Sequence, residues 1–509
     1  MYLCGLNDAA MSNIKKLANQ TVIYGGTTIV GRLLNYLLVP FHTYIFLDPK
    51  NYGVVGEMYA WMALLLVILT YGMETAYFRF SNSEPDKKRV FSSTLWLLLS
   101  TSALFVVLGL CFSQPIANLL KYPSHPEYIR WFVVIVAMDA VSCIPFAHLR
   151  GENKALQFAG IKIANILINV FFNIFFLWFC PLMIRHGLGT GFFSAIYHEN
   201  IGVGYIFIAN LIASVCQFIL LIACCKNIEF KVDVSLLKRM LKYAFPLLIL
   251  GLAGIVNETM DRILIKNLSS ADAEEAMRNV GIYSACFKIS VIMNLFIQAF
   301  RYAAEPYFFN QYKEKDAKEG YSVVMTYFVI VCTFIFLVTT LYLDYLKYFA
   351  SERYHAGLQV VPPLLLAFMM LGMMYNLSIW YKLTGQTKFG AYITVGGAAI
   401  TLVVNFLLIP RIGIMGAAIA HFTTYFCMMT ASYFLGQKYY PVPYQLKKIG
   451  FYVGFSLLLF GIGFYLLPWL FGSGYALWMK TLINTLLVAV FAMVTIKKEY
   501  PNLQKMMHA

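Results

Sequence analysis

The chain repeats one feature along almost its whole length: an apolar segment long enough to cross a lipid bilayer as a helix. A hydrocarbon layer about 30 Å thick needs roughly 20 helical residues for one crossing. The sequence therefore predicts an all-α polytopic membrane protein with about fourteen transmembrane helices. The predicted spans are residues 19–46, 51–75, 90–113, 129–148, 155–183, 201–224, 243–265, 279–305, 321–343, 358–381, 389–409, 413–436, 449–467 and 480–496.

Composition agrees with this class, because 60% of the residues are hydrophobic and only 12% are charged. Soluble domains carry about 25% charged residues. No polar stretch is long enough for a soluble catalytic domain. The ten cysteines form no CxxC pair and no cluster with histidine at metal-ligand spacing, so they are interpreted as packing residues, and no metal or cofactor is predicted. Lys15 and Lys16 precede a first span too long for a cleavable signal, and Met11 is an alternative start.

The basic residues predict the orientation. If the spans alternate, 24 of the 39 Lys and Arg residues fall on the side of the termini, 10 on the other side and five within spans. Positive residues accumulate on the cytoplasmic side of membrane proteins. We therefore expect both termini in the cytoplasm, with the protein in a bacterial cytoplasmic (inner) membrane. The net charge of +15 is then explained by the excess of basic residues in the cytoplasmic segments. These basic residues are dispersed along the chain and form no basic domain, which argues against a nucleic-acid partner.

Internal similarity at an offset of about 230 residues predicts two related halves. Leu149-Arg150-Gly151-Glu152-Asn153-Lys154 resembles Leu383-Thr384-Gly385-Gln386-Thr387-Lys388, and Tyr77-Phe78 recurs as Tyr307-Phe308. Gly202-Val203-Gly204 similarly matches the region from Gly413 to Gly416. The expected organisation is an N-terminal lobe at 1–226, a C-terminal lobe at 227–437, and two further spans with a cytoplasmic tail at 438–509. Repeated six-helix bundles suit alternating access around a central site.

Two spans carry polar side chains at helical spacing. The fifth span has Lys162, Asn165, Asn169 and Asn173, and the eighth has Asn294, Gln298, Arg301 and Glu305. Residues three or four apart share one helix face. These stripes predict either a polar path through the membrane or hydrogen-bonded contacts between helices.

Further charges lie in other spans. Arg32 follows several glycines in the first span, Lys288 lies in the eighth, and Asp139 stands alone in the fourth, where it can serve either as a hydrogen-bond partner or as a coupling-ion site. The seventh span holds Glu258, Asp261 and Arg262, of which Glu258 and Arg262 are spaced to form an ion pair. Glu57 is expected at the membrane interface. Five cations within spans, against few buried acids, favour an anionic cargo, because Arg binds phosphate well.

A stretch near the C-terminal end carries a family resemblance. Residues 396–425, which read GGAAITLVVNFLLIPRIGIMGAAIAHFTTY, are similar to the signature of polysaccharide-unit flippases in the multidrug/oligosaccharidyl-lipid/polysaccharide (MOP) exporter superfamily. Tyr52-Gly53 and Tyr77-Phe78-Arg79 resemble the N-terminal half of that family. Fourteen spans also resemble the lipid II flippase branch. The resemblance implies a V-shaped fold like that of the multidrug (MATE) exporters, with two helices added at the C-terminus. An insertion at about 184–200 departs from the pattern.

The implied function is transfer of an undecaprenyl-pyrophosphate-linked oligosaccharide from the cytoplasmic to the periplasmic leaflet for surface polysaccharide biosynthesis, such as that of lipopolysaccharide. On this interpretation the candidate pyrophosphate ligands are Arg32, Lys162, Arg262, Arg301 and Lys288. The candidate sugar contacts are Asn165, Asn169, Asn294 and Gln298. Candidate ion-coupling residues are Asp139, Glu258 and Asp261.

The nearest alternative is a multidrug/cation antiporter of the MATE type. An enzyme such as a glycan polymerase or glycosyltransferase is disfavoured, because the longest predicted outer loop, of about 20 residues, holds few acids or histidines. A monomer is expected to act on lipid-linked oligosaccharide among membrane lipids, with glycan-assembly proteins as candidate partners.

Overall fold

The described part of the protein is helical. A computed structural model of the chain describes residues 25–27, 29–225, 231–311, 314, 316–471 and 476–507, and these ranges contain no β-strand. Thirteen helices within them are long and apolar enough to cross a membrane. Each coincides with one of the last thirteen predicted spans, and a helix at residues 29–45 lies in the first predicted span. The predicted fold class, an all-α membrane protein with about fourteen spans, is confirmed.

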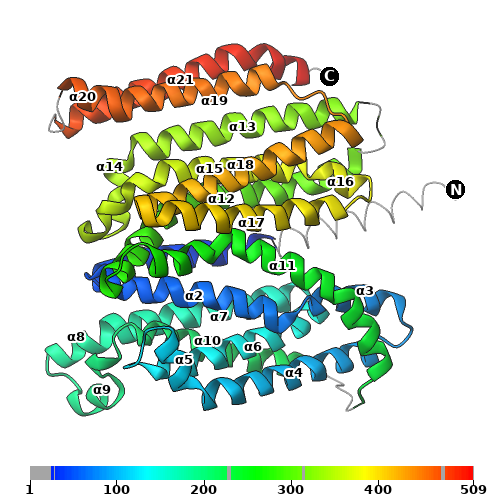
Figure 1. Ribbon diagram of the computed structural model, residues 1–509, viewed down its shortest axis with the longest axis vertical. Helices are drawn as coiled ribbons and strands as arrows, with labels where there is room; N and C mark the ends of the chain where they lie inside the picture. Colours follow the sequence, from blue (N-terminus) through cyan, green and yellow to red (C-terminus); the bar gives the residue numbers. More distant parts are fainter. Residues whose placement is uncertain are drawn as a thin grey trace. The chain divides into compact units, whose positions relative to one another are not determined.

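The elements follow one another in the order shown in Figure 1. In the first part of the chain the helices are α2 (Pro49–Thr70), α3 (Met73–Ser83), α4 (Lys87–Cys111), α5 (Ser113–Leu119), α6 (Pro126–Gly151), α7 (Ala155–Ile174), π-helical η1 (Phe175–Phe179), α8 (Cys180–Arg185), α9 (Thr190–Ile196), 3₁₀-helical η2 (Glu199–Ile201), α10 (Gly204–Cys224) and α11 (Val234–Leu268).

The second part of the chain contains longer helices and several short connecting ones. They are α12 (Ala273–Gln311), α13 (Ala317–Leu341), α14 (Leu343–Leu346), 3₁₀-helical η3 (Lys347–Phe349) and η4 (Glu352–Val360), α15 (Val361–Leu377), α16 (Ile379–Leu383), α17 (Lys388–Ile412), α18 (Ile414–Tyr439), α19 (Leu446–Gly461), π-helical η5 (Ile462–Leu466), α20 (Leu467–Phe471) and α21 (Leu477–Met507).

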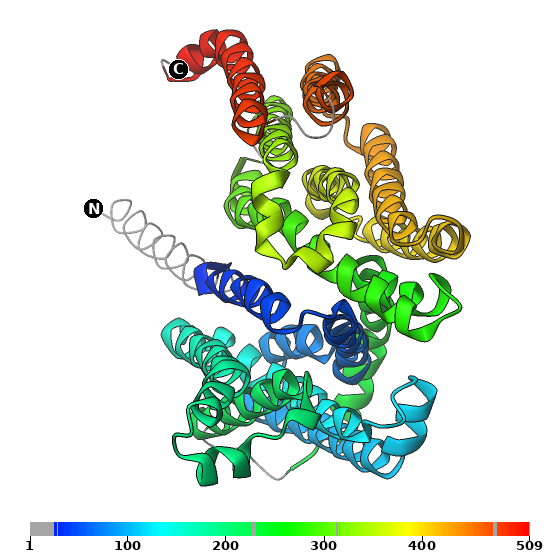
Figure 2. The same cartoon turned by 90° about the vertical axis from the view of Figure 1, so that its left-hand side faces the viewer.

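The contacts divide the chain into two compact units. Unit 1 comprises residues up to Phe46 together with Val54–Ile263, and unit 2 comprises Leu47–Gly53 with the chain from Leu264 onwards. In unit 1, α6 packs against α4 and α10, and α10 also packs against α7. In unit 2, α18 packs against α15 and α17, while α13 packs against α19 (Figure 2). The predicted lobe boundary near residue 226 follows the internal repeat, and it stays a prediction.

Unit 1 extends into α11 because the first turns of this helix pack on α3 and α4. Leu236, Leu237, Met240 and Ala244 are buried in one cluster with apolar side chains of those two helices. The bend between α2 and α3 fits this contact, since Gly72 has φ +74° and a Cβ there would lie 3.0 Å from the Ala244 carbonyl oxygen. A larger residue at this position would force the helices apart.

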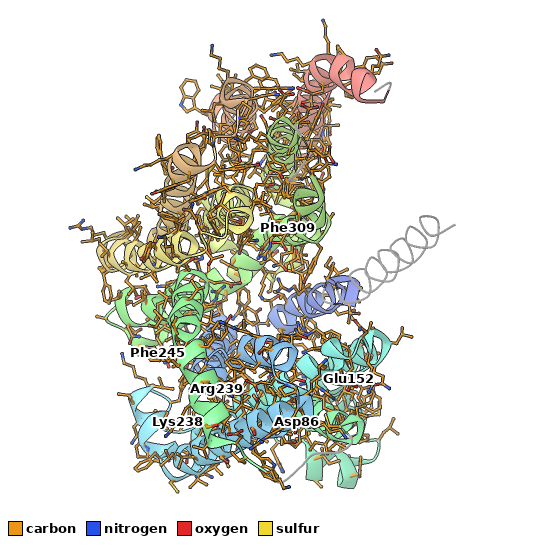
Figure 3. The ribbon with its side chains drawn as sticks, turned by 90° about the vertical axis from the view of Figure 1, so that its right-hand side faces the viewer. Asp86, Glu152, Lys238, Arg239, Phe245 and Phe309 are labelled. Atoms are coloured by element: carbon orange, nitrogen blue, oxygen red, sulfur yellow. The ribbon has the colours of Figure 1, made fainter. Side chains whose placement is uncertain are left out.

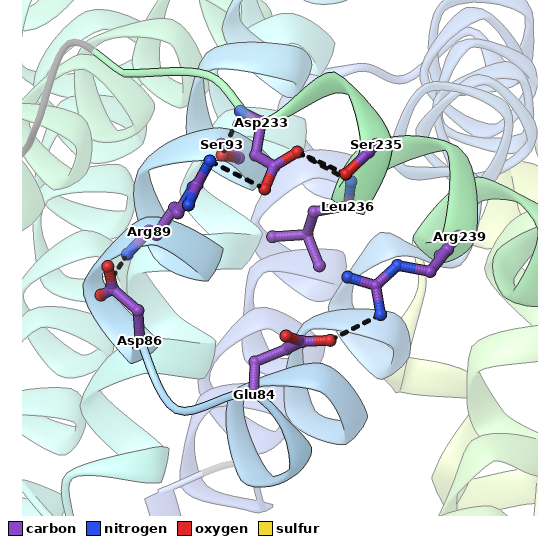
Figure 4. Close-up of polar contacts among 8 residues, drawn as sticks. All are labelled: Glu84, Asp86, Arg89, Ser93, Asp233, Ser235, Leu236 and Arg239. Atoms are coloured by element: carbon purple, nitrogen blue, oxygen red, sulfur yellow. Dashed lines mark hydrogen bonds and ion pairs between the residues drawn. The ribbon is translucent and has the colours of Figure 1, made fainter.

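Polar contacts surround the same junction. Arg89 pairs with Asp233 at 3.1 Å, and Arg239 pairs with Glu84 at 2.8 Å, so α11 is joined to both sides of the α3–α4 turn (Figure 4). Hydrogen bonds from the Leu236 N–H and then the Ser235 hydroxyl lower the pKa of Asp233 below its ordinary value. We call these contacts the α11 clasp. Figure 3 shows Lys238 and Arg239 on α11, with Asp86 just before α4.

The stretch of residues 396–425 forms the tight α17–α18 hairpin. Gly413 joins the helices at φ +58°, and a Cβ on Gly416 would lie 2.6 Å from the carbonyl carbon of Leu408. The Asn405 side chain is fully buried, and its amide donates to the Thr401 carbonyl oxygen at 2.7 Å. The glycine and asparagine positions in this stretch therefore serve close helix packing.

The insertion between the fifth and sixth spans, at about residues 184–200, forms hydrogen bonds to one tyrosine of the sixth span. Its residues form the end of α8, the short helix α9 and the turn η2. Tyr205, on α10, accepts a hydrogen bond from the His198 backbone N–H at 2.7 Å and donates to the Ile196 carbonyl oxygen at 3.2 Å. Tyr197 stacks on the Tyr205 ring, with centroids 5.1 Å apart.

Candidate functional site

The polar stripe predicted on the eighth span lies on α12 and leads to a cluster of charges in unit 2. Arg301 Nε lies 3.6 Å from Glu305 Oε1, a contact that a spacing of four residues on a helix allows. Lys382, from α16, donates to the same Glu305 oxygen at 2.6 Å. The Arg301 guanidinium also lies over the Tyr375 ring of α15, 4.4 Å from its centroid. We call Arg301, Glu305, Tyr375, Lys382 and the adjoining Asn376 the Glu305 cluster.

Two cations share a single carboxylate in the Glu305 cluster, which leaves one positive charge in excess. Its side chains line a small cavity of about 10 Å³. Asn376 is 6% exposed, and its amide donates to the Gly372 carbonyl oxygen at 3.2 Å. The side-chain charges of Arg301, Glu305 and Lys382 are only 31–42% exposed, so they are screened by water less than fully exposed charges. This arrangement favours an anion with several oxygens.

Other predicted residues of α12 lie earlier along the helix. Gln298 donates to the Asn294 side-chain oxygen at 3.4 Å, and both side chains are half-buried. Lys288 is also half-buried. The sequence therefore identified the α12 stripe, but Tyr375 and Lys382 were missed as site residues because α15 and α16 supply them.

In unit 1, the predicted Lys162 and Asp139 come close enough to interact electrostatically. Asp139 accepts a hydrogen bond from Ser214 at 3.1 Å, and the Lys162 ammonium lies 4.2 Å from the centroid of the Phe146 ring. Helices α6, α7 and α10 supply these groups. Asp139 is therefore not isolated, and a hydrogen bond of the kind expected holds its carboxylate in place.

The remaining α7 stripe divides into two parts. Asn165 and Asn169 are half-buried, whereas Asn173 has no exposed surface. Asn173 donates to the Asn169 side-chain oxygen at 3.0 Å, and its own oxygen lies 2.8 Å from Nε2 of His42. Asn173 thus joins two helices and does not line a path. His42 was missed by sequence reasoning, although it lies ten residues after Arg32 on the same predicted span.

On α11, the predicted ion pair between Glu258 and Arg262 does not form. Arg262 instead pairs with Asp261, whose Oδ1 lies 3.0 Å from Nη1 of Arg262. The same guanidinium donates to the Glu258 backbone carbonyl oxygen at 3.2 Å, while the Glu258 side chain is exposed. Asp261 is fully buried and Arg262 is 9% exposed, so each neutralises the other where solvent screening is weak.

Arg32 differs from the other predicted cations. Its side chain is exposed on the helix at residues 29–45, and no ion pair joins it to any described residue. An unpaired guanidinium facing hydrocarbon would cost at least about 2.5–3.5 kcal/mol. A polar path beside Arg32 stays a prediction.

Comparison with known proteins identifies the family. Residues 17–312, more than half of the chain, match the family described as polysaccharide biosynthesis protein. The chain belongs to this family. No curated protein matches the sequence.

Solved structures show the fold of this polysaccharide biosynthesis protein. The chain is similar to lipid II flippase MurJ in an inward closed conformation, with a TM-score of 0.67 and 13% identity over 94% of this chain and 99% of the other. It is also similar to an inward-facing multidrug resistance MATE transporter of the MOP superfamily, with a TM-score of 0.61 and 14% identity over 81% and 94% of the two chains. At these identities the likeness shows a shared fold.

Proposed function

We propose that this polysaccharide biosynthesis protein is a flippase that moves an undecaprenyl-pyrophosphate-linked oligosaccharide from the cytoplasmic to the periplasmic leaflet of a bacterial inner membrane. The observation that carries the proposal is the Glu305 cluster, where Arg301 and Lys382 share one carboxylate. Family membership and the fold of a lipid II flippase support it.

Flipping needs a polar path, because the cargo cannot cross hydrocarbon unaided. Each hydroxyl that enters an apolar phase without a partner costs several kcal/mol, and a diphosphate costs far more. In the proposed mechanism, the diphosphate takes the place of Glu305 as the partner of Arg301 and Lys382. The polyprenyl tail stays in the lipid, since it gains nothing from leaving hydrocarbon.

Further predicted residues complete the proposed path. Arg32 and Lys162 attract the diphosphate as it advances, and Arg262 and Lys288 contribute positive potential. Asn165, Asn169, Asn294 and Gln298 bind sugar hydroxyls. The two lobes alternate in exposing the bound cargo to each side of the membrane.

Movement of the anion can draw on the membrane potential. An inside-negative potential favours outward transfer by about 2.3 kcal/mol per charge for each 100 mV. Asp139, Glu258 and Asp261 are the candidate sites for a coupled ion. Of these, Asp139 is the strongest, because Asp261 is already paired with Arg262 and Glu258 is exposed.

The experiment is complementation of a strain that lacks this protein, scored by surface polysaccharide at matched protein levels. Arg301→Ala and Lys382→Ala should each reduce surface polysaccharide by about tenfold, because a charge-assisted hydrogen bond contributes roughly 1.5–3 kcal/mol. Arg278→Ala is the matched control, since Arg278 lies on the same helix and pairs with Asp48 at 3.2 Å, away from the cluster. Full polysaccharide in both cluster variants would refute the assignment.

A MATE-type cation antiporter is the competing function, and the same variants separate the two. For a cationic drug, loss of Arg301 would remove a repulsive charge and should not impair export. Drug resistance conferred on an efflux-deficient host by the wild-type protein, and kept by Arg301→Ala, would favour the antiporter.

A further inference from the structure

A second polar cavity lies in unit 2 and shares no residue with the Glu305 cluster. It has a volume of about 210 Å³ and lies where the end of α13 meets α14, the π-helical segment η5 and the first turns of α21. Predicted spans 13 and 14, which fall outside the internal repeat, supply much of its wall. We call it the Asp344–Lys480 cavity.

Positively and negatively charged side chains line the Asp344–Lys480 cavity. Lys480, on α21, forms an ion pair with Asp344, on α14, and Lys347 Nζ lies 3.9 Å from the other carboxylate oxygen of Asp344. Their side chains are 26–31% exposed. The Asp344–Lys480 pair is therefore partly withdrawn from water but still reachable by a ligand.

A buried amide adds a hydrogen-bond acceptor. Asn484, on α21, is 2% exposed, and its Nδ2 donates to the Leu341 carbonyl oxygen at 2.6 Å. Its Oδ1 has no hydrogen-bond partner among the described residues. Leaving a buried acceptor unpaired is costly, so its presence at a cavity wall points to a donor from outside the protein.

The Gly463 backbone packs closely against the side chains of Leu341 and Asn484 at the wall of the cavity. A Cβ on Gly463 would lie 2.4 Å from Leu341 Cδ2 and 3.1 Å from Asn484 Oδ1. Gly463 belongs to the π-helical segment η5, and such segments occur frequently at functional sites.

Aromatic side chains near the cavity indicate its depth in the membrane. Tyr345 and Tyr348, one and four residues after Asp344, are 45% and 55% exposed, and Trp478, two residues before Lys480, is 70% exposed. Tyr and Trp gather at the level of lipid headgroups. The cavity therefore opens at headgroup depth, with Leu343, Leu358 and Phe464 as its apolar wall.

We propose that the Asp344–Lys480 cavity binds the headgroup of a phospholipid that carries both a phosphate and a primary ammonium group. Lys480 donates to the phosphate, while Asp344 and the Asn484 oxygen accept from the ammonium, which has three donors. Lys480 and Asp344 then each exchange the other for a group of opposite charge on the lipid, so neither is left without a partner. The proposal is independent of the cargo of the transporter.

The test is native mass spectrometry of the purified, delipidated protein with equal amounts of dioleoyl phosphatidylethanolamine, phosphatidylcholine and phosphatidylglycerol. The wild-type protein should retain phosphatidylethanolamine about tenfold more than the other two lipids, since only its headgroup has both a phosphate and hydrogen-bonding ammonium donors. Asp344→Asn should remove most of this preference. Asp48→Asn is the matched control, because it breaks a surface ion pair, with Arg278, that is not part of the Asp344–Lys480 cavity.

A second variant separates loss of the site from loss of the fold. Leu358→Trp fills the cavity without changing a charge, and it should abolish the preference while the protein keeps its elution profile and helical circular dichroism. Equal retention of the three lipids by the wild-type protein would overturn the proposal. An unchanged preference in both Asp344→Asn and Leu358→Trp would do the same.

Discussion

The buried carboxylate of Glu57 accepts hydrogen bonds from two specific side chains. The sequence predicts Glu57 at the membrane interface, and within the protein its side chain is 1% exposed. It accepts hydrogen bonds from the Tyr122 hydroxyl and, at 3.2 Å, from Trp61 Nε1. Burial, followed by the nearby charge of Glu57, raises the pKa of Tyr122 well above its ordinary value, which keeps the phenol protonated as a donor.

Tyr122→Phe removes one donor from a buried carboxylate. We expect the free energy of unfolding to fall by about 1–3 kcal/mol, because a buried charge then lacks a hydrogen bond. Denaturant unfolding in detergent measures this change. Tyr392→Phe, at a side chain that is 67% exposed, is the control and should change stability little. Equal effects of the two substitutions would contradict the role given to Tyr122.

From the sequence, contacts within the candidate site could be predicted only where both residues lie on the same helix. The spacing of Arg301 and Glu305 predicted that both lie on one face of a helix, where the structure pairs them. Glu258 and Arg262 have the same spacing and were expected to be able to pair, but the structure pairs Arg262 with the buried Asp261. Lys382 could not be found from sequence spacing, since only tertiary packing brings α16 to α12.

Glycine allows two helices to cross closely at some points in this fold, because it has no Cβ. At the start of α2, a Cβ on Gly53 would lie 2.2 Å from the Met277 carbonyl oxygen. On α12, a Cβ on Gly281 would lie 1.8 Å from the Pro49 carbonyl oxygen. Backbones can approach this closely only where small residues face each other. The Tyr52-Gly53 match to the family thus has a packing cause.

Gly281→Ala should destabilise the protein by about 1–3 kcal/mol, because the new methyl group overlaps a backbone oxygen that cannot rotate away. Gly160→Ala is the matched control, since a Cβ at that position on α7 meets no atom within 4 Å. The control should leave stability unchanged or raise it by up to about 1 kcal/mol, the helix propensity difference. Thermal unfolding of both variants gives the comparison, and a harmless Gly281→Ala would show that the crossing is not tight.

The α11 clasp predicts a local dependence on pH. The pKa of Asp233 is lowered in the folded protein, so its stabilising contribution is present above the ordinary carboxyl pKa of about 3.9 and is lost as the pH falls through the lower folded value. At neutral pH, Asp233→Asn should increase amide hydrogen exchange at Leu236 and Leu237. The difference from the wild-type protein should shrink as the pH falls through the lowered folded pKa of Asp233, and it should vanish once the folded carboxyl is protonated. Identical exchange at neutral pH would show that the charge of Asp233 does not hold α11.

For the whole molecule, the spans were predictable because hydropathy and length are local properties of the sequence. Thirteen predicted spans coincide with described helices, and the resemblance to the MOP superfamily agrees with the family and the fold. The bend at Gly72 and the junction of α11 with α3 and α4 were not predictable, since they depend on contacts between residues far apart in the chain. The cytoplasmic orientation of both termini remains a prediction from the distribution of basic residues.

Transport of a fluorescent polyprenyl-diphosphate oligosaccharide by proteoliposomes tests the central proposal most directly, because it isolates cargo recognition by the cations of the Glu305 cluster. The wild-type protein should flip the lipid, and Arg301→Ala combined with Lys382→Ala should slow flipping at least about tenfold. Glu305→Gln removes the competing carboxylate and should strengthen binding of the diphosphate. Flipping that is unaffected by the double substitution, or abolished by Glu305→Gln, would contradict an anionic cargo at this cluster.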